Sequence, residues 1–223
     1  MGVNEAVDPV LDALLDRSEA FEAAMAVCFT EAGYVLAVSD QRHELVAAAC
    51  DLCIEHARVV RASLAIGAPN SGAAVLRIQY EALLRAAWVL FAASPLHIEK
   101  LSRALDLEAE QAAKNVPSYM DMLEAIEKKA PEGLAAPLAE FNQYSRHALN
   151  SFVHSGIHPL SRARDGFPPE MSLTIVRFSN GLLHLAYRIL ASLSGSQQLM
   201  ARVTSVHLAF PECVPGLAKA KSG

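Results

Sequence analysis

Helix starts recur along the whole chain, whereas no segment alternates apolar and polar residues convincingly in the manner of a β-strand. Asp8-Pro9 is typical of a helix cap followed by the first helical residue, because aspartate accepts a hydrogen bond there and proline lacks the donor that would stay unpaired. Similar signals predict helices at 9–30, 40–66 (capped by Ser39), 71–93, 95–115, 117–129, 131–154, 169–192 and 197–210. One apolar run, 34–38, is ambiguous, and the longest loop is expected at 155–169.

These segments predict an all-α protein. The chain of 223 residues contains no detectable repeat and no linker long enough to divide it. We therefore expect a single all-helical domain over residues 1–210, built as an elongated bundle of seven or eight mostly antiparallel helices. Residues 211–223 end in Lys-Ala-Lys-Ser-Gly and are expected to form a flexible C-terminal tail.

Composition excludes several functional classes. The net charge of −5 and pI near 5.9 argue against a broad nucleic-acid platform, which is typically basic. No apolar run approaches the length of a membrane span, and the first residues lack the features of a signal peptide, so we expect a cytoplasmic protein with reduced cysteines. Cys50 and Cys53 have the spacing of metal ligands, but no second Cys/His pair follows. The sequence thus predicts no metal site and no cofactor.

The predicted helix 71–93 is apolar nearly all round and is expected to be the central buried element. Within it Arg77, Glu81 and Arg85 recur every four residues and form one charged row, with Tyr80 beside it. In one interpretation the row is an internal ion ladder in which Glu81 reaches both arginines. In the other it lines a cleft where two guanidinium groups bind a phosphate or carboxylate, with Glu81 and Tyr80 in contact with the ligand.

A second group of polar residues ends the predicted helix 131–154. Its members share one helical face or flank it: His147, Asn150, Ser151 and His154 on the face, with Arg146 and His158 nearby. Two histidines and two hydrogen-bonding side chains on one stripe beside a glycine-containing loop indicate a functional site. Ser151, His158 and Arg146 are expected to contact a ligand there.

His184 stands alone among apolar residues in the predicted helix 169–192. A lone histidine on such a face is most often a core residue whose ring is hydrogen-bonded. We interpret it as a core or interface residue.

The segments 74–88, around the arginine row, and 149–156 together resemble a bacterial family of unknown function, the DUF6988 type. That family is similar in turn to HEPN-like helical proteins, many of which are ribonucleases of toxin–antitoxin and phage-defence systems. The resemblance implies a HEPN-like bundle that dimerises with itself and assembles its site from both subunits. In the HEPN signature an arginine precedes a polar residue and a histidine; here Asn150 and His154 match, but Leu149 stands at the arginine position.

Three functions stay open on the sequence. A metal-independent ribonuclease needs a base, an acid and positive charge near the phosphate: His154 or His147 for proton transfer, Arg77 or Arg85 for charge, and Asn150 for orientation. The alternative is a non-catalytic helical module that binds a small anionic ligand or a protein partner. The third is a structural homodimer whose charges fix packing.

Overall fold

The computed structural model describes residues 8–104 and 116–216, and all regular structure within them is helical. The α-helices are α1 (Pro9–Ala32), α2 (Gln41–Ala65), α3 (Pro69–Phe91), α4 (Pro95–Ser102), α6 (Tyr119–Lys129), α7 (Glu132–Val153), α8 (Ile157–Asp165), α9 (Pro169–Leu193) and α10 (Gln197–Ser205). Two 3-10 turns follow, η1 (Val206–Ala209) and η2 (Pro211–Cys213). The predicted all-α class is confirmed for this part of the chain.

Side-chain caps set several helix starts. The Asp8 carboxylate accepts a hydrogen bond from Val10 N at 2.9 Å, and Pro9 occupies the first helical position of α1. Ser118 and Asp121 form a reciprocal capping box at the start of α6. At the end of α1, Gly33 adopts a φ of 60°, a conformation that residues with a Cβ rarely adopt.

Helix boundaries differ from the sequence prediction at several places; α10, for example, ends at Ser205, whereas the predicted helix continues to residue 210. α2 is capped by Asp40 rather than Ser39, because the Asp40 carboxylate accepts from His43 N at 2.8 Å. α3 already starts at Pro69, and α4 ends at Ser102, where the backbone becomes extended. The rest of the predicted helix 95–115 lies largely at 105–115, outside the described residues.

The segment predicted as the longest loop contains a helix, α8. Its glycine, proline and arginine residues suggested irregular structure, yet Pro159 lies in the first turn of α8, where a missing N–H costs no helical hydrogen bond. The described residues therefore form nine α-helices, not the seven or eight that we predicted. The ambiguous run 34–38 is not a strand; the N–H of Ala37 donates to the Leu193 carbonyl at 2.9 Å.

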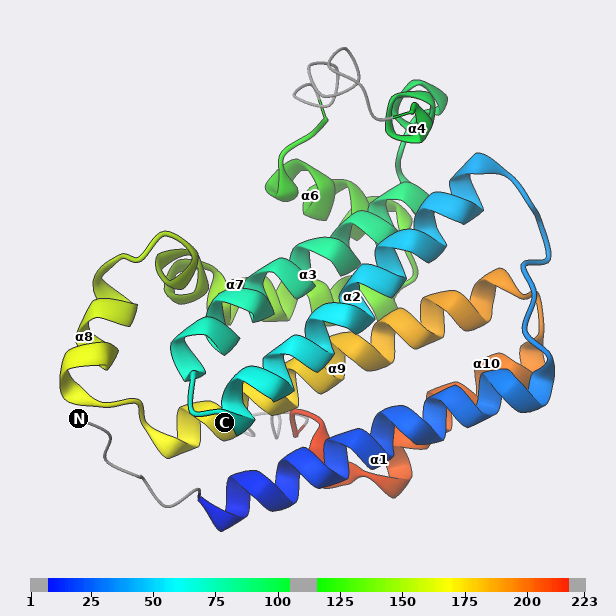
Figure 1. Ribbon diagram of the computed structural model, residues 1–223. Helices are drawn as coiled ribbons and strands as arrows, with labels where there is room; N and C mark the ends of the chain where they lie inside the picture. The colour runs from blue at the N-terminus through cyan, green and yellow to red at the C-terminus, as the bar shows by residue number, and fades with distance from the viewer. Residues whose placement is uncertain (1–7, 105–115, 217–223) are drawn as a thin grey trace, which may run out of the picture.

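α3 lies at the centre of the bundle and packs against α2, α6, α7 and α9 (Figure 1). α2 and α3 form a long antiparallel hairpin, and α7 runs antiparallel to α3 on its other side. α1 packs mainly against α9 and α10, along the opposite edge of the molecule. This arrangement buries most of the apolar side chains of α3 and α9.

The first residues after 210 pack against the bundle. η2 contacts α1 and α9, and Cys213 is fully buried. Asn180 donates to the Cys213 carbonyl at 2.9 Å, while Arg17 and Glu212 form an ion pair of 2.6 Å on the surface. Residues 211–216 thus pack against the middle of α9, at Arg177, Asn180 and Gly181.

Candidate functional site

The predicted histidine stripe lies on the outer face of α7 near its C-terminal end. His147, Asn150 and His154 are exposed, and within the described part of the chain their side chains form no hydrogen bond. All three are therefore accessible to a molecule in solution.

Ser151 belongs instead to the turn that joins α7 to α8. Its Oγ accepts a hydrogen bond from the backbone N–H of His158 at 3.2 Å. The turn is tight, because Ser155 has a φ of 51° and a Cβ added at Gly156 would lie 2.6 Å from Ser151 Oγ. The His158 ring lies beside Phe152, with ring centroids 6.1 Å apart. These contacts hold α8 against α7.

The arginine beside the histidine stripe does not lie at the position that the HEPN signature predicts. Leu149, at the place of the HEPN arginine, is only 4% exposed and belongs to the hydrophobic core. Arg146 is exposed and lies one helical turn before Asn150, without an ion pair to any described residue. Arg146 is thus the arginine on α7 itself that borders the stripe.

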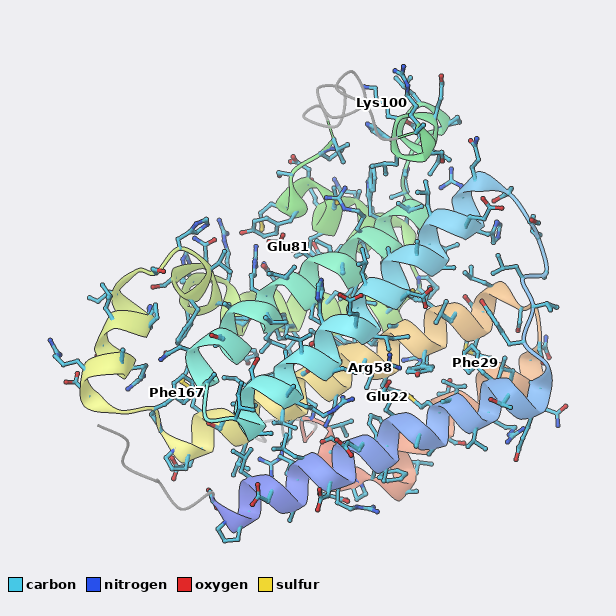
Figure 2. All side chains as sticks on the ribbon, viewed as in Figure 1. Glu22, Phe29, Arg58, Glu81, Lys100 and Phe167 are labelled. Carbon is cyan, nitrogen blue, oxygen red and sulfur yellow. The ribbon has the colours of Figure 1, made fainter. Side chains whose placement is uncertain are left out.

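The charged row on α3 contains one ion pair. Arg77 is 3% exposed, its Nε donates to Glu81 at 2.9 Å, and its guanidinium lies 4.2 Å from the centre of the Tyr119 ring. The Glu81 side chain is 46% exposed and projects beside α6 (Figure 2). The pair therefore reaches the surface at its acidic end.

Arg85 and Tyr80 flank this pair differently. Arg85 is exposed and forms no ion pair with a described residue, so Glu81 does not bridge two arginines. Tyr80 is fully buried: its hydroxyl donates to the Leu138 carbonyl at 3.2 Å, and its ring stacks on Phe141 at 4.8 Å. Burial raises the pKa of Tyr80 well above its usual value. Tyr80 is thus placed in the core.

The two groups of predicted site residues do not meet. The Tyr80–Leu138 hydrogen bond fixes the register of α3 against α7. From that bond His154 lies roughly 24 Å along α7, whereas Arg77 lies only about 5 Å along α3 in the same direction. Arg85 lies on the other side of Tyr80, farther still. Neither arginine of α3 reaches His154 within one copy of the chain.

A cavity of about 420 Å³ lies elsewhere, between α7, α9, the end of α10 and residues 214–216. This volume is in the range of small-molecule sites. Apolar side chains, among them Phe141, Phe178 and Leu182, form most of its wall. Five polar side chains also line it: Glu140, His184, Arg188, Thr204 and His207.

Arg188 is the unusual residue of this cavity. Its Nη1 donates to the Gly133 carbonyl at 3.3 Å, but its Nε is buried without a partner. No carboxylate of a described residue forms an ion pair with it, although Glu140 lines the same cavity. Burial lowers the pKa of Arg188. A half-buried cation without a counter-ion is unfavourable, and an anion in the cavity would relieve that cost.

Two histidines complete the polar lining. His184 Nε2 lies 2.9 Å from the Val203 carbonyl and His207 Nδ1 lies 2.6 Å from the Thr204 carbonyl, with the two ring centroids 5.3 Å apart. Burial lowers the pKa of His184 to about 4, so its ring is neutral near pH 7. Because a carbonyl only accepts, Nε2 of His184 carries the hydrogen and Nδ1 is left as an acceptor.

The sequence does not point to this cavity. His184 is buried and hydrogen-bonded, in the manner expected of a core residue. The one local signal is the spacing of His184 and Arg188 at i and i+4, which places two polar side chains on one face of an otherwise apolar stretch. The residues from η1 onward that close the cavity gave no such signal.

Within residues 8–104 and 116–216, no three His, Cys, Asp or Glu side chains are arranged to hold a metal ion. All four cysteines are buried and unpaired, and burial raises the pKa of Cys53 to about 12. None of the described helices combines the length and the apolar character that crossing a membrane requires.

Comparison with known proteins gives one match. A family model described as a family of unknown function, DUF6988, matches residues 50–216. No curated protein and no solved structure shows a significant match to the chain.

Proposed function

The chain belongs to the DUF6988 family of unknown function, and we propose that it is a non-catalytic helical module that binds a small anionic ligand in the cavity between α7 and α9. The observation that carries this proposal is Arg188, whose buried Nε has no partner. A guanidinium binds a carboxylate or a phosphate through parallel hydrogen bonds, so an anion is the natural partner.

The charge of the cavity favours a ligand with a single negative charge. Arg188 is the one cationic side chain among the described residues that line it. Glu140 adds a negative charge at the wall, so a phosphate dianion would leave surplus negative charge in a largely apolar space. A carboxylate adds only one negative charge, and its two oxygens match the guanidinium of Arg188.

The wall favours a ligand with an apolar body. Phe141, Phe178 and Leu182 present rings and methyl groups, and burying such surface against an aliphatic or aromatic chain contributes about 25 cal/mol per Å². We therefore expect a medium-chain or aromatic monocarboxylate, with its carboxylate at Arg188.

Isothermal titration with octanoate tests this function. Octanoate should bind the wild-type protein, and 1-octanol, which has the same chain without the charge, should bind more weakly. Substitution of Arg188→Met should weaken octanoate binding about 10- to 100-fold, because a charged hydrogen bond contributes about 1.5–3 kcal/mol.

The matched control is Arg85→Met, which removes an exposed arginine of α3 far from the cavity. This variant should bind octanoate as the wild type does. Equal binding of octanoate and octanol, or unchanged binding by Arg188→Met, would contradict the proposal.

A metal-independent ribonuclease of a toxin or defence system is the second candidate. The observation in its favour is the exposed stripe of His147, Asn150 and His154, whose side chains have no partner among the described residues. Two imidazoles can serve as base and acid for cleavage at a 2′-hydroxyl. Because Leu149 is buried, Arg146 is the residue of α7 that could supply positive charge.

RNA cleavage in the presence of EDTA tests this second function. A ribonuclease should lose activity in His154→Ala while its helical signal and melting temperature stay the same, since the side chain is exposed. The conservative control is Val153→Ala, an exposed neighbour outside the stripe. Absence of cleavage by the wild-type protein would exclude this function.

A further inference from the structure

An exposed apolar row runs along the outer side of α2. Its members recur at alternating spacings of four and three residues and are all exposed: Ala48, Leu52, Glu55, Val59, Ala62 and Ile66. Five of the six are apolar, and Ile66, at the end of the helix, is 79% exposed. Apolar residues at this spacing are typical of the surface along which one helix packs against another.

α3 widens the row into a face. Ile78 is 44% exposed, and Val75 and Ala82, three or four residues away on the same side, are partly exposed. In Figure 1 the α2–α3 hairpin forms the front layer, and no other helix of the described chain crosses in front of it. Contiguous apolar surface of this kind marks an interaction site.

We propose that this α2–α3 face binds the same face of a second copy of the chain, with the two α2 helices antiparallel about a two-fold axis near residue 57. In this register each layer sets a large residue against a small or acidic one: Leu52 against the partner's Ala62, Ile66 against the partner's Ala48, and Val59 against the partner's Glu55. The row is thus complementary to itself, as a two-fold interface requires.

The charges on α2 agree with this register. Glu55 is the one charged member of the row, and near the axis it comes within reach of the partner's Arg58. Arg58 uses Nε and Nη2 to bind Glu22 of its own chain, which leaves Nη1 for the second carboxylate. The two-fold axis forms this contact twice.

The size of the face is adequate for a stable dimer. The row from Ala48 to Ile66 is about 27 Å long, and two helices side by side are about 20 Å wide. Its footprint is about 540 Å² per partner, or about 1,080 Å² in total, which is smaller than a standard interface but above the roughly 1,000 Å² that a specific interface should exceed. The face includes neither Arg188 nor His154, so the proposal is independent of both candidate functions.

Sedimentation or light scattering tests the dimer. The wild-type protein should have twice the chain mass of 23.9 kDa. Val59→Glu should raise the dissociation constant at least about 30-fold, because it sets a second carboxylate directly against the partner's Glu55 on both sides of the axis. Val35→Glu, at a site that is 71% exposed but off the face, should leave the dimer intact.

Disulfide formation tests the register. The native cysteines are all buried, so the unmodified chain should not cross-link under mild oxidation. The double variant Leu52→Cys/Ala62→Cys should form a covalent dimer, and each single variant should form much less. Within one chain these positions are roughly 15 Å apart along α2, too far for a disulfide.

The possible results test the proposed face and the proposed register separately. A monomeric wild-type protein at tens of micromolar, or a dimer that Val59→Glu does not weaken, would overturn the proposed face. A dimer that Val59→Glu dissociates but that the double cysteine variant does not cross-link would overturn the antiparallel register.

Discussion

Two concave regions of the molecule each contain an arginine that is at least half-buried. They differ in whether a carboxylate of the protein binds that arginine. The groove between α1 and α2, about 500 Å³ in volume, contains Arg58 and Arg61, and Glu22 binds both of them (Figure 2). The cavity between α7 and α9 contains Arg188, with no carboxylate bound to it among the described residues. In the groove both arginines are bound by a carboxylate of the same chain, whereas Arg188 has no such partner among the described residues, which is the basis of the proposed anion site.

Arg77 on α3 is intermediate between the paired arginines of the groove and Arg188, which forms no ion pair with a described residue. It is more deeply buried than Arg188, yet Glu81 and the Tyr119 ring both contact it. A charged side chain on an apolar helix is therefore paired within the fold on α3, whereas Arg188 on α9 has no carboxylate partner among the described residues. The difference lies in the partner, which comes from the same helix in one case and is missing in the other.

The largest change in the free energy of unfolding is expected in the groove between α1 and α2. Glu22→Ala should lower the free energy of unfolding by about 3–5 kcal/mol, because it leaves the buried Arg61 without its carboxylate. Glu212→Ala is the control: it breaks an exposed pair with Arg17 and should cost much less than Glu22→Ala. Equal losses in urea titrations would remove the distinction between buried and exposed arginine pairs.

Acid should destabilise the protein through His184. Its pKa is about 4 in the folded protein, below the ordinary 6.5, so the unfolded chain binds the proton more strongly. Stability is complete above pH 6.5 and falls as the pH drops toward 4, by up to about 3 kcal/mol. His184→Gln, which keeps a donor for the Val203 carbonyl, should lack this part of the pH dependence. An identical pH profile for the variant would contradict the buried neutral histidine.

The α3 pair should show an intermediate effect. Glu81→Ala should cost about 1–3 kcal/mol, since it leaves Arg77 buried without a carboxylate while the Tyr119 ring remains. Arg85→Ala removes an exposed, unpaired charge and should change stability by less than about 0.5 kcal/mol. A loss in Arg85→Ala as large as that in Glu81→Ala would mean that Arg85 has a partner after all.

The smallest change in the free energy of unfolding should be an increase rather than a decrease. Arg188→Met removes an uncompensated half-buried charge and should raise the free energy of unfolding by about 1 kcal/mol in the absence of ligand. Arg77→Met should lower it, because that arginine is paired. Denaturant titrations of the two variants side by side decide whether the signs differ; a loss in both would place Arg188 among the structural arginines.

The sequence predicted the helices well because their starts are local. Asp8, Ser94 and Ser118 cap the helices that follow them through atoms only two or three residues away. α8 was missed because its start has no side-chain cap and contains Gly156 and Pro159, which resemble a loop. From local sequence signals alone, a proline in the first turn of a helix cannot be distinguished from a proline in a loop.

The candidate site was harder to predict because it depends on tertiary partners. The spacing of Arg77 and Glu81 shows that they can pair, but not that the Glu81 carboxylate reaches the surface. Tyr80 lies next to the row in sequence, yet it points into the core toward Leu138. Arg188 is separated by more than fifty residues from the Gly133 carbonyl that it contacts, so its missing counter-ion is visible only in the fold.

The central claim is that Arg188 is held for an anion. Its side-chain Nε–H signal in a ¹H–¹⁵N spectrum, identified by its loss in Arg188→Met, reports directly on that claim. Addition of octanoate should shift this signal as the carboxylate binds the unpartnered Nε–H, while 1-octanol should leave it in place. An Arg188 signal that octanoate does not move would contradict the account.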